Sequence, residues 1–151
     1  MPGEEEMVRD HEEANRLLRD LLRAIDGGEI DIDLFERISV GLRRHIYAEE
    51  EDMFPRALQA RPDLSAKVSG LEMEHASIWM LLDRVEGEIR RNEVVKAPKY
   101  VQEIYDILQA HNVQEEKDVY PVAGTDPPLA SFRVPDGWVC RKLRRPASTG
   151  H

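Results

Sequence analysis

The sequence is poor in cysteine and in aromatic residues. Its 151 residues include a single cysteine, Cys140, so no disulfide can form within the chain. Aromatic residues make up only 6% of the composition and charged residues 34%, a balance that disfavours aromatic-rich strands and favours amphipathic helices. A chain of this length has the size of one domain with a substantial core.

The sequence also lacks any run of about 18 apolar residues, so it predicts no membrane-spanning helix. Its first ten residues, MPGEEEMVRD, have neither the positive charge nor the apolar stretch of a secretory signal peptide. We therefore expect a cytoplasmic protein. Thirty acidic residues against 21 basic ones give a formal charge of −9, which disfavours nucleic acid and anionic membranes as partners.

Four segments have apolar residues at every third or fourth position, which is the periodicity of amphipathic helices. The first covers residues 4–25 and ends before Gly27-Gly28. The second begins at an aspartate cap, either Asp31 or Asp33, and continues through a disturbance at Pro55.

The third and fourth segments follow the same pattern. Asp63 is expected to cap the third, whose apolar stripe runs from Leu71 to Ile89. Pro98 suits the first turn of the fourth, which ends at Tyr120-Pro121. Four helices with short connections and no alternating strand pattern predict an all-α fold, an antiparallel up-and-down four-helix bundle over residues 1–123.

Residues 124–151 have a different composition and are expected to form an irregular tail. Four of the nine prolines lie there, and five basic residues against two acidic ones make the tail positively charged. Leu129, Phe132 and Trp138 are apolar anchors, so we expect this tail to pack on the acidic bundle. Recruitment of an anionic protein partner by the basic residues is the alternative.

The second and fourth segments contain the same eleven-residue pattern. HIYAEEEDMFP at residues 45–55 aligns without a gap with HNVQEEKDVYP at residues 111–121. The first and third helices match as well, because Asp10-His11 precedes one apolar stripe as Glu74-His75 precedes the other. The chain is therefore two copies of a helical hairpin, each with one lone histidine and one His-x-x-x-Glu.

Helical spacing directs these polar residues into the core. Residues at i, i+3, i+4 and i+7 share one face of a helix, and each histidine or glutamate continues an apolar stripe at that spacing. Six residues are predicted to face inward in this way: His11, His45, Glu49, His75, His111 and Glu115. Burying such groups costs several kcal/mol unless they are compensated, and a cation would compensate them.

Four histidines and two carboxylates without a thiolate suit iron, manganese or zinc. One ion does not need six inward ligands, so we expect two ions bridged by Glu49 and Glu115. Iron is favoured because this arrangement suits redox chemistry, with zinc or manganese as substitutes. A polar network without metal is the alternative.

Further acidic residues follow each of these glutamates. Glu50, Glu51 and Asp52 are most simply a solvated acidic face, because only Glu49 lies four residues after a histidine. Glu50 and Glu116, five residues after a histidine, are alternative ligands if the helix is locally overwound.

A lone histidine, His-x-x-x-Glu, a second lone histidine and a second His-x-x-x-Glu on successive helices resemble the hemerythrin-like family, also called the HHE cation-binding domain. The resemblance covers residues from about 7 to 121. It implies a non-haem di-iron centre in an up-and-down four-helix bundle. The implied ligands are His11 and His45 for one iron, His75 and His111 for the other, and Glu49 and Glu115 as bridges.

Two features separate the chain from oxygen-carrying hemerythrins. Those proteins have His-x-x-x-His on the third helix, whereas Trp79 follows His75 by four residues here. Their last helix has an aspartate five residues after its histidine, where this chain has Glu115 at four.

The resemblance implies a di-iron protein that binds or reduces a small diatomic or peroxide ligand: dioxygen, peroxide or nitric oxide. Whether it acts as an enzyme that reduces peroxide or oxygen stays open. One alternative is an iron- or redox-sensing module that signals to a protein partner through its bundle or tail. Another is a metal-stabilised bundle without chemistry.

Overall fold

The computed structural model of the chain describes residues 2–25, 29–123 and 129–144. All regular structure in these residues is helical, so the predicted all-α class is confirmed. The elements in chain order are α1 (Pro2–Ile25), α2 (Ile32–Ala48), the π-helical turn η1 (Glu49–Met53), α3 (Phe54–Ala60), the 3₁₀ turn η2 (Pro62–Leu64), α4 (Ser65–Arg90), α5 (Ala97–Gln114), the π-helical turn η3 (Glu115–Val119), α6 (Tyr120–Ala123) and the 3₁₀ turns η4 (Leu129–Ser131) and η5 (Arg141–Leu143).

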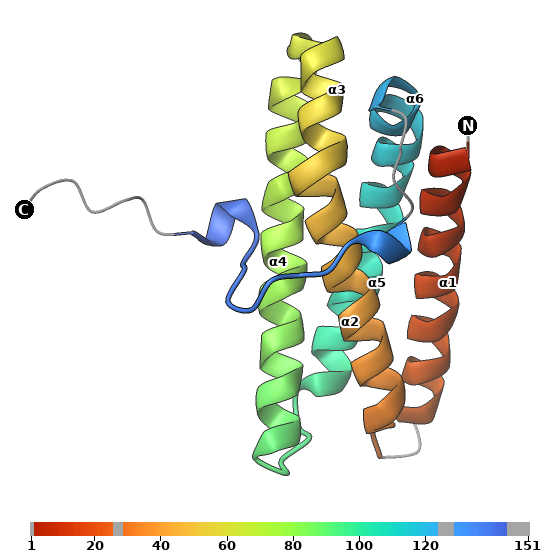
Figure 1. The fold of residues 1–151 in the computed structure, drawn as a ribbon. Helices are drawn as coiled ribbons and strands as arrows, with labels where there is room; N and C mark the ends of the chain where they lie inside the picture. Colours follow the sequence, from red (N-terminus) through yellow and green to blue (C-terminus); the bar gives the residue numbers. More distant parts are fainter. Residues whose placement is uncertain (1, 26–28, 124–128, 145–151) are drawn as a thin grey trace, which may run out of the picture.

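These elements form four rods that lie side by side (Figure 1). Two of the rods are composite, because α2 continues through η1 into α3, and α5 continues through η3 into α6. α1 contacts α2 and α5, and α4 contacts the same two helices, so the rods close into a helical bundle. No helix within the described residues is long and apolar enough to cross a membrane.

The helix starts follow local sequence at two positions and depart from it at a third. Asp31 caps α2, since its carboxylate accepts a hydrogen bond from the Leu34 backbone N–H at 3.0 Å. Pro98 lies in the first turn of α5, as predicted. The expected cap at Asp63 is wrong: a 3₁₀ turn precedes α4, and Arg61 binds the Asp63 carboxylate instead. Gly27-Gly28 lies outside the described residues.

The expected disturbance at Pro55 is a π-helical turn that precedes the proline. The Phe54 backbone N–H donates to the Glu49 carbonyl, five residues earlier, and the Tyr120 N–H donates to the Glu115 carbonyl in the same way before Pro121. Such turns insert one extra residue into an α-helix, which is therefore underwound and not overwound as considered from the sequence. Each turn begins at a glutamate of a His-x-x-x-Glu motif.

Two apolar clusters fill the bundle. One includes Leu18, Leu82 and Ile104, and the other includes Met53 and Val119. On each rod the motif histidine lies in sequence between members of these two clusters: His11 between Met7 and Leu17, His45 between Leu42 and Met53, His75 between Leu71 and Ile78, and His111 between Leu108 and Val119. The packing of the bundle therefore brings the four histidines to one level.

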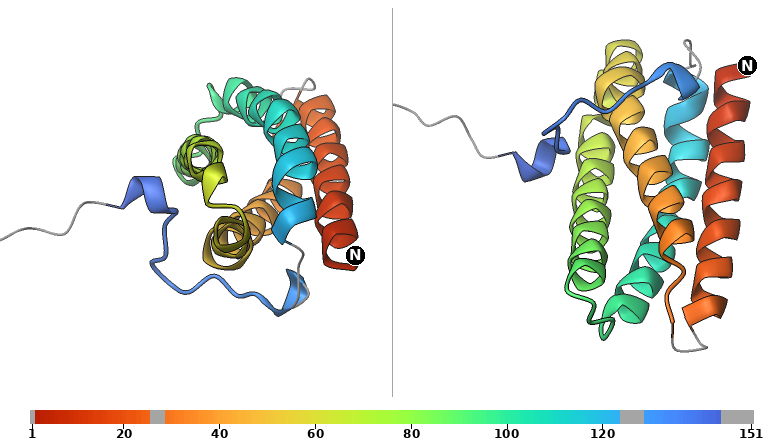
Figure 2. Two further views of the ribbon diagram at one scale, coloured as in Figure 1. Left: turned by 90° about the horizontal axis from the view of Figure 1, so that it is seen from above. Right: turned by 60° about the horizontal axis from the view of Figure 1, so that its bottom comes forward.

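Residues 129–144, called the strap below, run along the outside of the bundle past α2 to α4 (Figures 1 and 2). Leu129 is buried in one apolar cluster, and Trp138 packs on the other. Cys140 is fully buried, and burial together with the nearby Glu50 carboxylate raises the pKa of its thiol to about 11. The thiol therefore stays protonated. The rest of the expected tail, residues 124–128 and 145–151, lies outside the described residues.

Candidate metal centre

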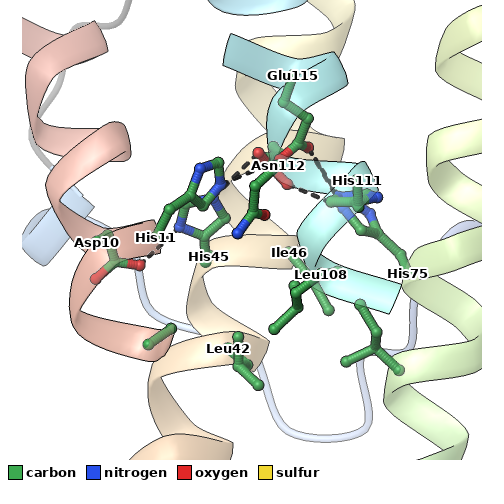
Figure 3. Close-up of a pocket in the computed structure, with 13 residues that line it drawn as sticks. Asp10, His11, Leu42, His45, Ile46, His75, Leu108, His111, Asn112 and Glu115 are labelled. Atoms are coloured by element: carbon green, nitrogen blue, oxygen red, sulfur yellow. Dashed lines mark hydrogen bonds and ion pairs between the residues drawn. The ribbon is translucent and has the colours of Figure 1, made fainter. Parts of the chain in front are cut away.

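The six residues singled out from the sequence come together in the middle of the bundle (Figure 3). Their side chains form two groups, and within each group one ligand atom per residue lies within 4.8 Å of the others. All six are buried. The two groups are His11, His45, Glu49 and Glu115, and Glu49, His75, His111 and Glu115. The two glutamates therefore belong to both groups.

In the first group, the Nε2 atoms of histidines from α1 and α2 point toward each other. His11 Nε2 lies 3.1 Å from His45 Nε2. Glu49 Oε2 lies 3.1 Å from His45 Nε2, and Glu115 Oε1 lies 3.2 Å from His11 Nε2.

The second group uses the other oxygen atom of each glutamate. Glu49 Oε1 lies 2.9 Å from His75 Nε2, and Glu115 Oε2 lies 3.1 Å from His111 Nε2. Each glutamate thus presents one oxygen atom to each pair of histidines. This is the orientation that a carboxylate needs to bridge two ions.

Every one of the four histidines has a carboxylate partner on its second ring nitrogen. The Nδ1 atoms lie 2.7–2.8 Å from these oxygens in the pairs His11–Glu116, His45–Asp10, His75–Glu50 and His111–Glu74. A carboxylate at Nδ1 favours the tautomer that carries its proton there, which leaves the Nε2 lone pair free for a metal.

The carboxylates at Nδ1 occupy equivalent positions in the two hairpins, but the sequence analysis did not identify them as partners of the histidines. Asp10 precedes one lone histidine and Glu74 the other, and each binds the histidine of the next long helix in sequence. Glu50 is buried at 2% exposure, so its assignment to a solvated acidic face is wrong, whereas Glu51 is exposed as expected. Glu50 and Glu116 contact Nδ1 atoms here and are not among the two ligand groups.

Tyr120 is a further site residue that sequence reasoning missed. Its buried hydroxyl donates to Glu49 Oε2 at 2.5 Å and lies 2.8 Å from His11 Nε2 and 3.0 Å from His45 Nε2. The equivalent residue of the other repeat, Phe54, stacks on the ring of His75 with no hydroxyl to offer. The signal was the aromatic position of the repeat, where the two copies differ. Tyr120 therefore gives the first group an additional hydrogen-bond donor.

Comparison with known protein families also indicates a cation-binding domain. Residues 3–123 match the family model of the hemerythrin HHE cation-binding domain. The chain belongs to this family. The match spans both hairpins and ends before the strap. No curated protein and no solved structure shows a significant match to the chain.

The carboxylates of this hemerythrin-like domain change the proton affinity of its histidines. Burial alone would lower the pKa of His45, but Glu49 and Asp10 outweigh it and raise that pKa well above 6.5. Burial likewise opposes protonation of His111, yet Glu115 and Glu74 raise its pKa to about 9. In the absence of a cation the site thus attracts protons, and a metal ion would replace them.

The donor set of this hemerythrin-like domain fits a pair of transition-metal ions. Glu115 Oε2 is buried and accepts no hydrogen bond, and its charge is balanced by the nearby imidazoles, with His111 Nε2 at 3.1 Å. Burial alone would raise the pKa of Glu115, but His111 and His11 lower it well below 4.5, so the group is charged. Nitrogen and oxygen donors without a thiolate suit iron, manganese or zinc.

A cavity of about 20 Å³ adjoins the six residues, which is room for about one water-sized molecule. Its other walls are largely apolar, with Leu42, Ile46 and Leu108 among the lining residues (Figure 3). The cavity shares Asp10, Ala14 and Leu42 with a groove between α1 and α2. A small uncharged or singly charged molecule can therefore be held beside these six side chains.

Proposed function

We propose that the protein holds two iron ions in its antiparallel up-and-down bundle and binds or reduces a small oxidant there: dioxygen, peroxide or nitric oxide. The observation that carries this proposal is the sharing of Glu49 and Glu115, each of which presents one oxygen atom to each pair of histidines. Zinc or manganese would fit the same donors, but zinc has no redox chemistry and could not reduce an oxidant.

The two ferrous ions would together supply the two electrons that, with two protons, convert one peroxide molecule into two waters. The chain's own residues prepare the site for this. The four Nδ1 carboxylates orient the imidazoles, and the apolar walls of the cavity keep bulk water away. Tyr120 holds a proton at the edge of the site, since burial and the neighbouring Glu115 and Glu49 raise the pKa of its hydroxyl well above 10.

Trp79 favours a reducing centre over a reversible oxygen carrier. It occupies the place of the extra histidine of oxygen carriers, but its ring packs against the guanidinium of Arg43 at 4.4 Å and against Trp138, outside the cavity. Each half of the site then has two histidines. We expect both ions to be accessible to one oxidant and to be oxidised together.

The experiment exposes the diferrous protein to air and then removes oxygen while the absorption spectrum is recorded. We expect a stable diferric spectrum, and we expect one equivalent of peroxide to oxidise the diferrous protein faster than it oxidises free ferrous iron. A variant without a bridge, Glu115→Ala, should lose this advantage over free iron. Recovery of the diferrous spectrum over repeated cycles would contradict the proposal and indicate a carrier.

A second candidate function, a sensing module, is supported by a link between the strap and the site. The backbone N–H of Arg141 donates to Glu50 Oε1 at 2.7 Å, and Glu50 Oε2 lies 2.8 Å from His75 Nδ1. One carboxylate therefore joins the strap to a histidine of the second group. A change in the charge of His75 would alter the contact that holds Arg141, and with it a surface open to a protein partner.

The sensing function predicts that the strap responds to iron. In a Trp79→Phe background, the fluorescence of Trp138, which contacts Glu51 and Tyr47, reports on the strap alone. Emission and protease cleavage of the strap should differ among the metal-free, diferrous and diferric forms. Identical behaviour in all three forms would exclude sensing through the strap. A fully solvent-exposed emission in every form would contradict its packing on the bundle.

A further inference from the structure

Asn112 is a buried amide without a hydrogen-bond partner. Only 6% of the residue is exposed, and both Nδ2 and Oδ1 are buried and unpaired. Buried polar atoms in proteins nearly always have a partner, and an unpaired one destabilises the fold. The unpaired amide of Asn112 therefore requires a physical explanation.

The side chain lines the same small cavity as the six metal-site residues (Figure 3). Asn112 directly follows His111 on α5, and its amide lies between the His11–His45 pair and the His75–His111 pair in the view of Figure 3. A molecule in the cavity would therefore meet the amide and the metal ligands at once.

The internal repeat shows that this amide makes the cavity asymmetric. The residue equivalent to Asn112 in the first hairpin is Ile46, which follows His45 and lines the same cavity. Leu42 and Leu108, another equivalent pair, are both apolar. Among the cavity-lining residues that belong neither to the six-residue site nor to its Nδ1 partners, Asn112 alone carries a side-chain hydrogen-bond donor.

We propose that Asn112 is the residue that binds the small ligand of this site, with its Nδ2–H group donating a hydrogen bond to the ligand. The inference rests on the proposed di-iron function and specifies how that site selects its ligand. The chemical class is a molecule of two or three atoms that the site holds at one end and whose free end, about the size of a water molecule and bearing lone pairs, enters the cavity. A diatomic molecule, peroxide and azide meet this description. An uncharged amide can serve this role without adding charge to a site that already has two buried glutamates.

Azide binding to the diferric full-length protein tests the inference. Asn112→Leu removes the donor at similar volume, and we expect the azide dissociation constant to rise about tenfold, the effect of losing one hydrogen bond to a charged ligand. In the wild-type protein the azide stretching frequency should shift when D₂O replaces H₂O, and this shift should be lost in Asn112→Leu. Asn15→Leu, the same change outside the cavity, is the matched control and should keep both values.

A readout without metal accompanies this experiment. The metal-free Asn112→Leu variant should melt a few degrees above the wild type, because an unpaired buried amide has been replaced by an apolar side chain. A residue that merely supports the fold would shift the melting temperature downward. If Asn112→Leu fails to retain two irons, Asn112→Ala carries the same azide comparison.

The outcomes separate this inference from the proposed function. If the wild type binds azide and Asn112→Leu binds it equally, with the same isotope shift, Asn112 has no role in ligand binding and the di-iron function stands. If the iron-loaded wild type binds no azide, the site has no open position, and both the proposed function and the inference are overturned.

Discussion

The carboxylate of Asp10 lies 2.7 Å from Nδ1 of His45 on the neighbouring helix, although His11 is the residue next to Asp10 in sequence. The other hairpin repeats this relationship, since Glu74 contacts His111 and not the adjacent His75. The orientation of each histidine therefore depends on the packing of two helices. The packing that builds the bundle therefore also orients the histidines of the candidate metal site.

Removing such a partner should weaken metal binding without removing a ligand. We expect Asp10→Ala to lower metal affinity about 10- to 100-fold, the range typical of carboxylates that support metal-bound histidines. Competition with a chromophoric chelator measures the affinity. Glu12→Ala changes an exposed carboxylate on the same helix and is the control. Equal affinities of Asp10→Ala and the control would show that the Nδ1 partner does not orient His45.

The bridging and terminal residues should respond differently to mutation. Because both groups share Glu49 and Glu115, replacing either by alanine should impair binding of both ions. Replacement of His75 by alanine should impair mainly one, since this residue belongs to one group only. Iron per chain, measured after removal of loosely bound metal, distinguishes the two cases. Loss of one ion in all three variants would argue against bridging.

The hydroxyl of Tyr120 should stabilise the metal-free protein. Tyr120→Phe removes a donor to Glu49 and leaves buried acceptors without it, so the free energy of unfolding should fall by about 1–3 kcal/mol. Denaturant unfolding of the metal-free variants measures this change. Tyr105→Phe, whose hydroxyl has one long contact with Arg19, should change stability far less. A similar loss in both variants would show that the hydrogen bonds of the Tyr120 hydroxyl stabilise the fold no more than a contact at the surface.

The stability of the metal-free protein should depend on pH through the histidines of the site. The pKa values of His45 and His75 are well above 6.5 and that of His111 is about 9, because nearby carboxylates outweigh burial. A raised pKa in the folded state stabilises the fold at pH values below 6.5, and this stabilisation is lost as the pH rises through the folded pKa. The metal-free protein should therefore become less stable between pH 6.5 and about 9.

Metal binding requires the neutral imidazoles. A rise in pH over this range therefore strengthens metal binding, while it lowers the stability of the metal-free protein. The difference in melting temperature between the two forms should widen from pH 6.5 to about 9. Thermal melts of both forms across this range measure the difference. A metal-free protein that melts as high as the loaded form at every pH would contradict the account.

The six central residues could be predicted because helical periodicity alone decides which residues share a face. His45 and Glu49 lie one turn apart, and His11 lies two turns from Leu18. Their Nδ1 partners could not be predicted in the same way, because Asp10 and Glu74 reach across to another helix, and that reach depends on how the helices pack.

Tyr120 escaped prediction for a different reason. Residues five positions apart point in different directions on an α-helix, so the spacing from Glu115 to Tyr120 predicts different faces. The π-helical turn that begins at Glu115 places its hydrogen bond between these two residues and brings them to the same side. The equivalent π-helical turn of the other hairpin, η1, contains Glu50, which lies in the core beside His75. Neither π-helical turn was predicted from the sequence.

The number of iron ions per chain tests the central claim most directly. Anaerobic titration of the metal-free protein with ferrous iron, followed by metal analysis and Mössbauer spectroscopy of the oxidised sample, gives both the count and the coupling between ions. Six inward ligands with two shared carboxylates predict saturation at about two irons per chain, with a spin-coupled diferric pair. Saturation at one iron per chain, or two irons without magnetic coupling, would contradict a carboxylate-bridged centre at Glu49 and Glu115.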